Sequence, residues 1–258
     1  MNITPPLDQL IRTVAGPPTG SQYVAAWAVD SGETEVAQAT ILTGLAAVPP
    51  RAPSAGELFL WFGEPGAGQW DDLLPHLPLA ERERAARFHY AEDRWSYTAA
   101  HAGLRAMLSA ALDIPPAEIA FVLGPKGKPR LDPARHGGDA ARAIEFNISH
   151  TRGLVAVACA AHAVGVDVER RRDMHDLMAV AARVFAAESY AALEAAEGLA
   201  RTDLFYRFWS LGEAFIKATG EGITQGLKSF AFTARGAPRL LRVEAPYGPA
   251  QRWRFGMV

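Results

Sequence analysis

The sequence predicts an α+β fold, and three observations lead to that prediction. Short β-branched segments cluster in the middle of the chain, and long Ala-rich or aromatic-rich segments with helical character flank them. The strands and helices do not alternate regularly, as they would in a series of βαβ units. With 49% hydrophobic residues in 258, the chain has enough apolar material for a sizeable core, in one large domain or two small ones.

The first 55 residues differ from the rest of the chain. Three Pro-Pro pairs stand among alanines and small polar residues. The apolar stretches 22–30 and 35–48 fit either short strands or turns of helix. We therefore expect residues 1–55 to form an extension of uncertain order, which ends in a Pro/Ala/Gly linker near 51–56.

From residue 57 onward the expected elements are clearer. Apolar or β-branched runs ended by breaks predict strands at 57–63, 119–123, 146–150, 154–160, 164–169, 229–233, 239–244 and 252–257. Helices are expected at 79–87, 93–112, 176–197 with a break around 186–189, and 202–219. Gly220 suits the position just after the last helix, and 154–160 with 164–169 has the form of a hairpin that turns near 161–162.

Composition excludes several classes of protein. The formal net charge of -2 gives no indication of nucleic-acid binding. The one cysteine, Cys159, lies in an apolar run, so a disulfide framework is excluded and a cytoplasmic protein is expected. No run of 18 apolar residues predicts a membrane span, and no secretory signal is recognisable.

The strongest local motif is Val164-Gly165-Val166-Asp167-Val168-Glu169. Strand residues two apart point to the same face, so Asp167 and Glu169 share one face and the valines take the other. Two neighbouring carboxylates repel each other unless a cation lies between them, and oxygen ligands suit Mg²⁺. A strand end that reaches solvent with two charged residues fits the motif equally well.

A second motif lies in the expected helix 202–219. Glu213 and Lys217 are four residues apart on one helix face, in the favourable order of Glu before Lys. The other face is apolar and rich in aromatic residues. Such a pair is most often a surface ion pair, but here it follows a carboxylate pair that lacks a third ligand.

Two further segments carry groups suited to phosphate. The run Phe146–Thr151 ends in hydrogen-bonding side chains, among them Ser149 and His150, although a capped loop would explain them as well. The loop Gly124–Arg130 carries three cations but is no P-loop, since Pro129 stands where Ser or Thr is required.

Two basic stretches complete the set of candidates. Arg82, Arg84 and Arg87 lie on or near one face of the expected helix 79–87. The run Arg170–Arg172 follows Glu169 directly. A charge run of this kind is usually a solvated surface.

Taken together and in this order, these segments resemble the Sfp-type 4′-phosphopantetheinyl transferases. The matching motifs are Gly127-Lys128-Pro129, Phe146-Asn147-Ile148-Ser149-His150, Gly165-Val166-Asp167-Val168-Glu169 and Trp209-Ser210-x-x-Glu213-Ala214-x-x-Lys217, with Glu81–Asp93 fitting an early helix of the family. The resemblance covers about residues 57–232.

The resemblance implies a fold and a function. The fold is two similar α+β halves related by pseudo-twofold symmetry, here 56–162 and 163–258, with coenzyme A in the cleft between them. The reaction is Mg²⁺-dependent transfer of 4′-phosphopantetheine from coenzyme A to a serine of an apo acyl or peptidyl carrier protein. A cytoplasmic monomer that binds neither nucleic acid nor membrane is implied as well.

The resemblance also assigns roles to residues. Asp167, Glu169 and Glu213 correspond to Mg²⁺ ligands, so we expect their carboxyl groups to converge. Lys217 and Glu213 correspond to catalytic residues, with the general base being either Glu213 or a metal-bound water. Contacts with coenzyme A fall to Lys128, Ser149, His150 and Arg84, of which Lys128 and His150 correspond to 3′-phosphate binders.

The chain departs from the family pattern at Gly212, where family members commonly carry Lys. The glycine removes a cation and costs the helix about 1 kcal/mol relative to Ala, so we expect Gly212→Lys to leave the transfer rate unchanged or higher. The first 55 residues have no counterpart in compact members, and the strand expected after 252–257 is missing. An inactive homologue that binds coenzyme A or a carrier protein is the alternative.

Overall fold

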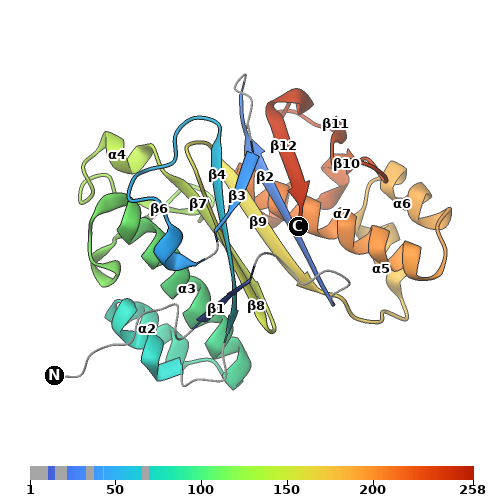
Figure 1. The fold of residues 1–258 in the computed structure, drawn as a ribbon. Helices are drawn as coiled ribbons and strands as arrows, with labels where there is room; N and C mark the ends of the chain where they lie inside the picture. Colours follow the sequence, from blue (N-terminus) through green and yellow to red (C-terminus); the bar gives the residue numbers. More distant parts are fainter. Residues whose placement is uncertain (1–10, 15–21, 33–37, 43, 66–69) are drawn as a thin grey trace.

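Two β-sheets face each other in the computed structural model, and helices cover the outer face of each (Figure 1). The structure describes residues 11–14, 22–32, 38–42, 44–65 and 70–258. Strands and helices are mixed and do not alternate as βαβ units, so the expected α+β class is confirmed. The layers therefore run helix, sheet, sheet, helix.

The first sheet is built around β4 (Glu57–Pro65). On one side, β4 pairs antiparallel with β8 (Leu154–Ala160), which pairs with β7 (Glu145–Thr151). On the other side, β1 (Ile11–Val14) and β3 (Gln38–Ile41) share the edge of β4, antiparallel and parallel respectively. The long helix α3 (Ala91–Leu112) covers the outer face and contacts β4, β7 and β8.

The second sheet has the strand order β12-β2-β9. Strand β2 (Tyr23–Asp30) lies in its centre, antiparallel to both β9 (Val164–Arg170) and β12 (Trp253–Met257). Helix α7 (Gly198–Thr219) covers its outer face, and Gly220 ends this helix with φ 74°, as expected. The second sheet thus depends on residues from the start and the end of the described chain.

Smaller elements complete the two halves. The first half also holds α2 (Leu79–Ala86), β5 (Phe121–Leu123), β6 (Pro129–Leu131) and α4 (Asp139–Arg142), and the second holds α5 (Leu177–Val184), α6 (Ala187–Glu194), β10 (Phe230–Phe232) and β11 (Leu240–Val243). The expected break around 186–189 is the boundary between α5 and α6. In Figure 1, α2 to α4 lie outside the first sheet and α5 to α7 outside the second.

Period-two alternation divides the apolar side chains among three core layers. On β8, Val155, Val157 and Cys159 pack toward α3, while Leu154, Ala156, Ala158 and Ala160 pack between the sheets. The valines of β9 (Val164, Val166 and Val168) enter the same inner layer. The opposite face of β9, which carries Gly165, Asp167 and Glu169, is therefore the face toward α7.

The expected hairpin between 154–160 and 164–169 is wrong. Both edges of β8 are occupied by β4 and β7, so β8 has no free edge for β9. The chain instead crosses from one sheet to the other at 161–162, and β9 pairs with β2. The hairpin partner of β8 is β7, with the turn at Gly153, whose φ of 87° favours glycine.

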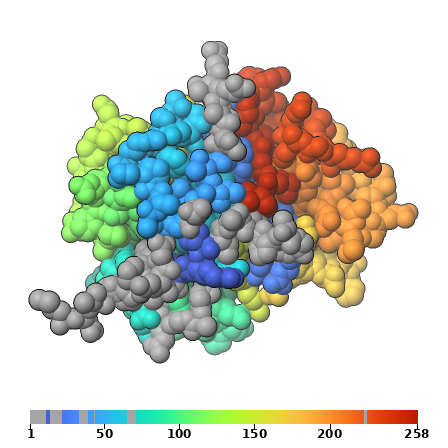
Figure 2. Space-filling view, viewed as in Figure 1, coloured from blue at the N-terminus to red at the C-terminus, as the bar shows by residue number. Residues whose placement is uncertain are grey.

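The first 55 residues contribute more than an extension. The apolar stretches 22–30 and 35–48 contain β2 and β3, so they fold as strands in part. Most side chains of β2 are buried, and Figure 2 shows the blue N-terminal residues between the two halves. The remainder of the expected extension (1–10, 15–21, 33–37 and 43) lies outside the described residues.

In the part of the chain that the structure describes, no helix combines the length and the hydropathy needed to cross a lipid bilayer.

We expect Ala28→Asp in β2 to lower the free energy of unfolding by at least about 3 kcal/mol, because an unpaired carboxylate would be buried against α7. Ala28 is fully buried and pairs with Gly165 in the register of β9. Urea denaturation measures the effect, with Ala237→Asp at an exposed position as the control. Equal stability of the two variants would show that β2 is dispensable.

Candidate active site between β9 and α7

Strand β9 and helix α7 approach each other more closely than side chains would ordinarily allow. A Cβ atom on Gly165 would lie 2.0 Å from the backbone oxygen of Ala214 and 2.6 Å from the backbone nitrogen of Ala218. Only glycine fits at this position, so the helix backbone rests directly on the strand. Asp167 is the next residue after Gly165 on the same face of β9. The close contact therefore brings side chains of α7 to Asp167.

Lys217 reaches from α7 to Asp167. Its Nζ lies 2.7 Å from Asp167 Oδ1 and also donates to Ser149 Oγ at 2.9 Å and to the Val166 oxygen at 3.2 Å. The surface ion pair of Lys217 with Glu213, which was the alternative explanation of this motif, is not found, since the ion pair that Lys217 makes among the described residues is with Asp167. A lysine on one element and a carboxylate on another therefore join helix and strand.

Ser149 occupies a fixed position in this network. Its hydroxyl donates to Asp167 Oδ1 at 3.1 Å and accepts from Lys217 and from the Val168 backbone N–H. One donor and two acceptor sites exhaust the capacity of a hydroxyl. In this arrangement Ser149 orients Asp167, and a direct contact with coenzyme A would require it to give up one of these bonds.

Asn147, two residues before Ser149 on β7, also binds the backbone of β9. Its Oδ1 accepts from the Val166 backbone N–H at 2.9 Å, two residues before the N–H that Ser149 accepts. Side chains of β7 thus satisfy backbone donors on the edge of β9 that faces away from β2. Asn147 and Ser149 therefore connect the two halves.

Two glutamates flank Asp167, and both hold their protons more tightly than usual. Burial, with the Asp167 charge as a further cause, raises the pKa of Glu169, although the Trp209 indole N–H donates to Glu169 Oε1 at 3.0 Å and counteracts the shift. Burial also raises the pKa of Glu213; Lys217 lowers it in part, and Asp167 adds to the rise. Asp167 therefore acts electrostatically on each of the two glutamates.

The donor set at this place suits a hard cation. Asp167 is 3% exposed, and its Oδ2 is buried with no hydrogen-bond partner among the described residues. An unsatisfied buried carboxylate oxygen is costly, and a cation between Asp167 and the glutamates would satisfy it and relieve their repulsion. In the geometry observed, no three acidic, His or Cys side chains of the described chain already form a metal-binding group, so binding would require the carboxylates to draw together.

A cavity of about 580 Å³ opens beside this network. Its lining includes Glu213, Lys217 and Asn147 from the network, together with the apolar Ile216 and Leu227. The remaining lining residues are Lys126, Gly127, Lys128, Pro129, Arg183, Val184, Gly220, Gly222, Gly226 and Lys228. We call this hollow the lysine cavity.

Lys128 lines the lysine cavity, but its ammonium group is already engaged. It donates to the backbone oxygens of Val164 and Ala218, each at 3.1 Å, and lies 3.5 Å from a Glu145 oxygen. Burial lowers its pKa. Lys128 thus fastens the β5–β6 loop to the second half, and its expected contact with a 3′-phosphate would break these bonds.

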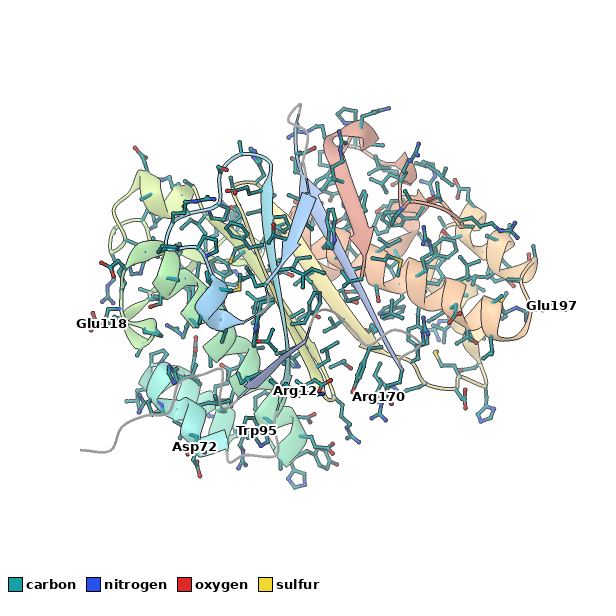
Figure 3. All side chains as sticks on the ribbon, viewed as in Figure 1. Arg12, Asp72, Trp95, Glu118, Arg170 and Glu197 are labelled. Atoms are coloured by element: carbon teal, nitrogen blue, oxygen red, sulfur yellow. The ribbon has the colours of Figure 1, made fainter. Side chains whose placement is uncertain are left out.

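His150 lies at a different hollow, of about 610 Å³, which we call the arginine cavity. It is lined by Asp93, Ser96, His150, Thr151, Arg152, Arg170, Arg171 and Arg172. Figure 3 labels Arg170 at the end of β9, at the junction of the two halves. Burial first, then the charges of His101 and Lys217, lower the pKa of His150, while Asp93 raises it.

Arg84 lines neither cavity. Its guanidinium stacks over the Tyr97 ring, 5.7 Å from the centroid, and the residue is absent from the lining of either hollow. The sequence-predicted residues therefore divide into three places. Asp167, Lys217 and Ser149 are in direct contact, and Asp167 acts on Glu169 and Glu213 through its charge. Lys128 and His150 line different hollows, and Arg84 lines neither.

The packing around Gly212 in α7 gives a reason for a glycine at this position that the sequence did not reveal. A Cβ atom there would lie 2.4 Å from Leu227 Cδ2 and 3.2 Å from the Phe230 ring. Gly212 thus provides a notch in α7 that the segment after α7 fills. This packing offers a second reason for the glycine, and our interpretation of it as a lost cation, which a lysine would restore, stays a prediction.

Sequence reasoning missed the roles of Trp209 and Arg183. Trp209 was counted on the apolar face of the helix, but its indole N–H holds Glu169, and its spacing of four residues before Glu213 was the signal that could have shown this. Arg183 lines the lysine cavity from the last turn of α5, and no pattern in the sequence indicates that.

Comparisons with known proteins identify the family to which this chain is similar. A family model described as the 4′-phosphopantetheinyl transferase superfamily matches residues 163–256, and one described as 4′-phosphopantetheinyl transferase, N-terminal, matches residues 61–162. The chain is 32% identical over 186 residues to the 4′-phosphopantetheinyl transferase HetI of Nostoc sp., covering 68% of this chain and 76% of that protein. It is 30% identical to a 4′-phosphopantetheinyl transferase of Bacillus subtilis (64% and 70% covered) and to Sfp of the same species (62% and 67%).

We expect Gly212→Lys to lower the free energy of unfolding by about 1–3 kcal/mol, because the new side chain must displace Leu227 and Phe230. The helix propensity gained offsets only part of this cost. Urea denaturation measures it, and adding Leu227→Ala to the variant should recover part of the loss by opening the notch. A Gly212→Lys variant as stable as the wild type would contradict the packing argument.

The raised pKa of Glu213 predicts a pH-dependent contribution to stability. A carboxyl group whose pKa is raised on folding stabilises the protein while protonated, below the ordinary value of 4.5, and that contribution is lost as the pH rises through the raised pKa. Glu213→Gln should therefore gain stability relative to wild type as the pH is raised from 4 to 8. Thermal unfolding across this range tests it, and a difference between Glu213→Gln and wild type that does not change with pH would contradict it.

Proposed function

We propose that this chain, which belongs to the 4′-phosphopantetheinyl transferase superfamily, transfers the 4′-phosphopantetheine group of coenzyme A to a serine of an apo acyl or peptidyl carrier protein, with Mg²⁺ as cofactor. The carrying observation is the network of Asp167, Lys217 and Ser149 between β9 and α7, with Glu169 and Glu213 beside it. Carboxylates next to an ammonium group and a cation-lined cavity suit the transfer of a phosphoryl group.

Several residues of the chain would bind and orient the donor substrate. Coenzyme A carries a diphosphate and a 3′-phosphomonoester, and the network lies between two hollows that both contain cationic side chains. We assign the 3′-phosphomonoester to the arginine cavity, where His150 and the arginines of 170–172 line one space. The diphosphate would then lie toward Lys217 and Glu213.

The transfer itself forms one bond and breaks one. The serine oxygen of the carrier protein attacks the phosphorus next to pantetheine, and the bond from that phosphorus to the departing adenosine 3′,5′-bisphosphate breaks. The serine proton passes to a carboxylate, and Glu213 is assigned this role because it lines the cavity beside Lys217. Lys217, held at Asp167, stabilises the charge that develops on the leaving phosphate.

Asp167, Glu169 and Glu213 are the residues that would hold Mg²⁺. Asp167 contributes its unpartnered Oδ2, and Trp209 holds Glu169 in place. The bound ion would neutralise charge on the diphosphate and orient it.

The alternative of an inactive homologue loses one of its supports. Gly212 was the main departure that favoured it, and the notch occupied by Leu227 explains this glycine by packing. The four residues with proposed catalytic and metal-binding roles come from β9 and α7, where Lys217 binds Asp167 and Trp209 donates to Glu169, and this supports the active enzyme.

We expect Asp167→Asn to reduce transfer by at least about a hundredfold, because it removes the charge that would hold a cation against the diphosphate. The assay incubates the protein with coenzyme A, Mg²⁺ and an apo carrier protein, and reads the intact mass of the carrier. Asp173→Asn, an exposed change six residues further along the chain, is the matched control. Equal rates for the two variants would remove Asp167 from the mechanism.

A further inference from the structure

The lysine cavity has an excess of positive charge. Five of its lining side chains are cationic (Lys126, Lys128, Arg183, Lys217 and Lys228), whereas Glu213 is the acidic residue among those described there. An apolar body can also be accommodated, since Val184, Ile216 and Leu227 line the same space. The cavity is therefore suited to an anion attached to a larger organic group.

Three of the five cations already have partners inside the protein. Lys126 lies 3.1 Å from Glu221, and Lys217 is paired with Asp167. Lys128 donates to two backbone oxygens and lies beside Glu145. Binding a ligand through any of these three would first break an existing interaction.

Arg183 and Lys228 are different. In the described part of the chain, neither side chain has a hydrogen-bond or ion-pair partner, and both are exposed. Each is held at the cavity by its backbone: Arg183 lies in the last turn of α5, and Lys228 follows Leu227, which is seated in the Gly212 notch. Their charges are thus placed at the cavity and remain available to a ligand.

We propose that Arg183 and Lys228 bind the diphosphate of coenzyme A in the lysine cavity. This assignment rests on the function proposed above and adds two substrate-binding residues to it. Cations without partners contact a phosphate without breaking bonds, and a guanidinium can do so with two parallel hydrogen bonds. The Gly212 notch would then contribute to substrate binding, because Leu227 packs in the notch and thereby places the next residue, Lys228, beside the substrate.

The diphosphate is favoured over the 3′-phosphomonoester by position. Glu213 and Lys217, to which the reaction is assigned, line the lysine cavity together with Arg183 and Lys228. His150 and the arginines of 170–172 line a separate hollow. The bond that breaks belongs to the diphosphate, so the cations beside the reacting groups are the ones expected to hold it.

Isothermal titration of the full chain with coenzyme A and with dephospho-coenzyme A, both with Mg²⁺, tests this assignment. We expect Arg183→Gln and Lys228→Gln each to weaken both ligands by about tenfold, because both ligands retain the diphosphate. His150→Ala should weaken coenzyme A alone, since only coenzyme A has the 3′-phosphomonoester. Arg235→Gln, at an exposed position away from both hollows, is the matched control and should change neither affinity.

The outcomes separate this inference from the function on which it rests. Wild-type protein that binds neither ligand would overturn the proposed function. Wild-type binding with unchanged affinities in both Gln variants would overturn only the assignment of Arg183 and Lys228. If these variants lost affinity for coenzyme A but kept it for dephospho-coenzyme A, they would contact the 3′-phosphomonoester and the diphosphate assignment would be wrong.

Discussion

The buried ion pair between Lys217 and Asp167 is the interaction on which the site depends. A carboxylate that is 3% exposed is tolerated only when its charge is compensated, and here an ammonium group and a hydroxyl supply the compensation. The three groups come from α7, β9 and β7, so the pair ties together both halves of the molecule. The close contact at Gly165 is what makes the pair possible, because it sets the distance between helix and strand.

The same network leaves the charge of the neighbouring carboxylates incompletely compensated. Lys217 occupies one oxygen of Asp167 and leaves the other buried without a partner. Glu169 and Glu213 are then left with raised pKa values, since burial disfavours their charged forms and Asp167 repels them. The single positive charge of Lys217 does not balance the charges of three carboxylates. A divalent ion together with an anionic substrate would complete the balance.

Two features outside the ion pair, strand β2 and the Gly212 notch, also determine how α7 is placed. Strand β2 pairs with β9 along its whole length, with Ala26 directly opposite Asp167. The small alanines of β2 on that face leave room for α7 to lie close to the sheet. On the other side of α7, the Gly212 notch receives Leu227, which lines the lysine cavity. The notch therefore fixes the position of this part of the cavity wall.

From the sequence alone, much of the local structure and the candidate site residues could be predicted. Alternation of valines and acids placed Asp167 and Glu169 on one face, and helical spacing placed Glu213 and Lys217 together, because both follow from local backbone geometry. Only the tertiary structure decided which strands pair, so it replaced the hairpin expected after β8 and gave β2 a central position. It also decided that Lys217 pairs with Asp167 rather than Glu213, that Lys128 is engaged by backbone oxygens, and that Leu227 packs against Gly212. These outcomes depend on contacts between segments far apart in the chain, which no local pattern encodes.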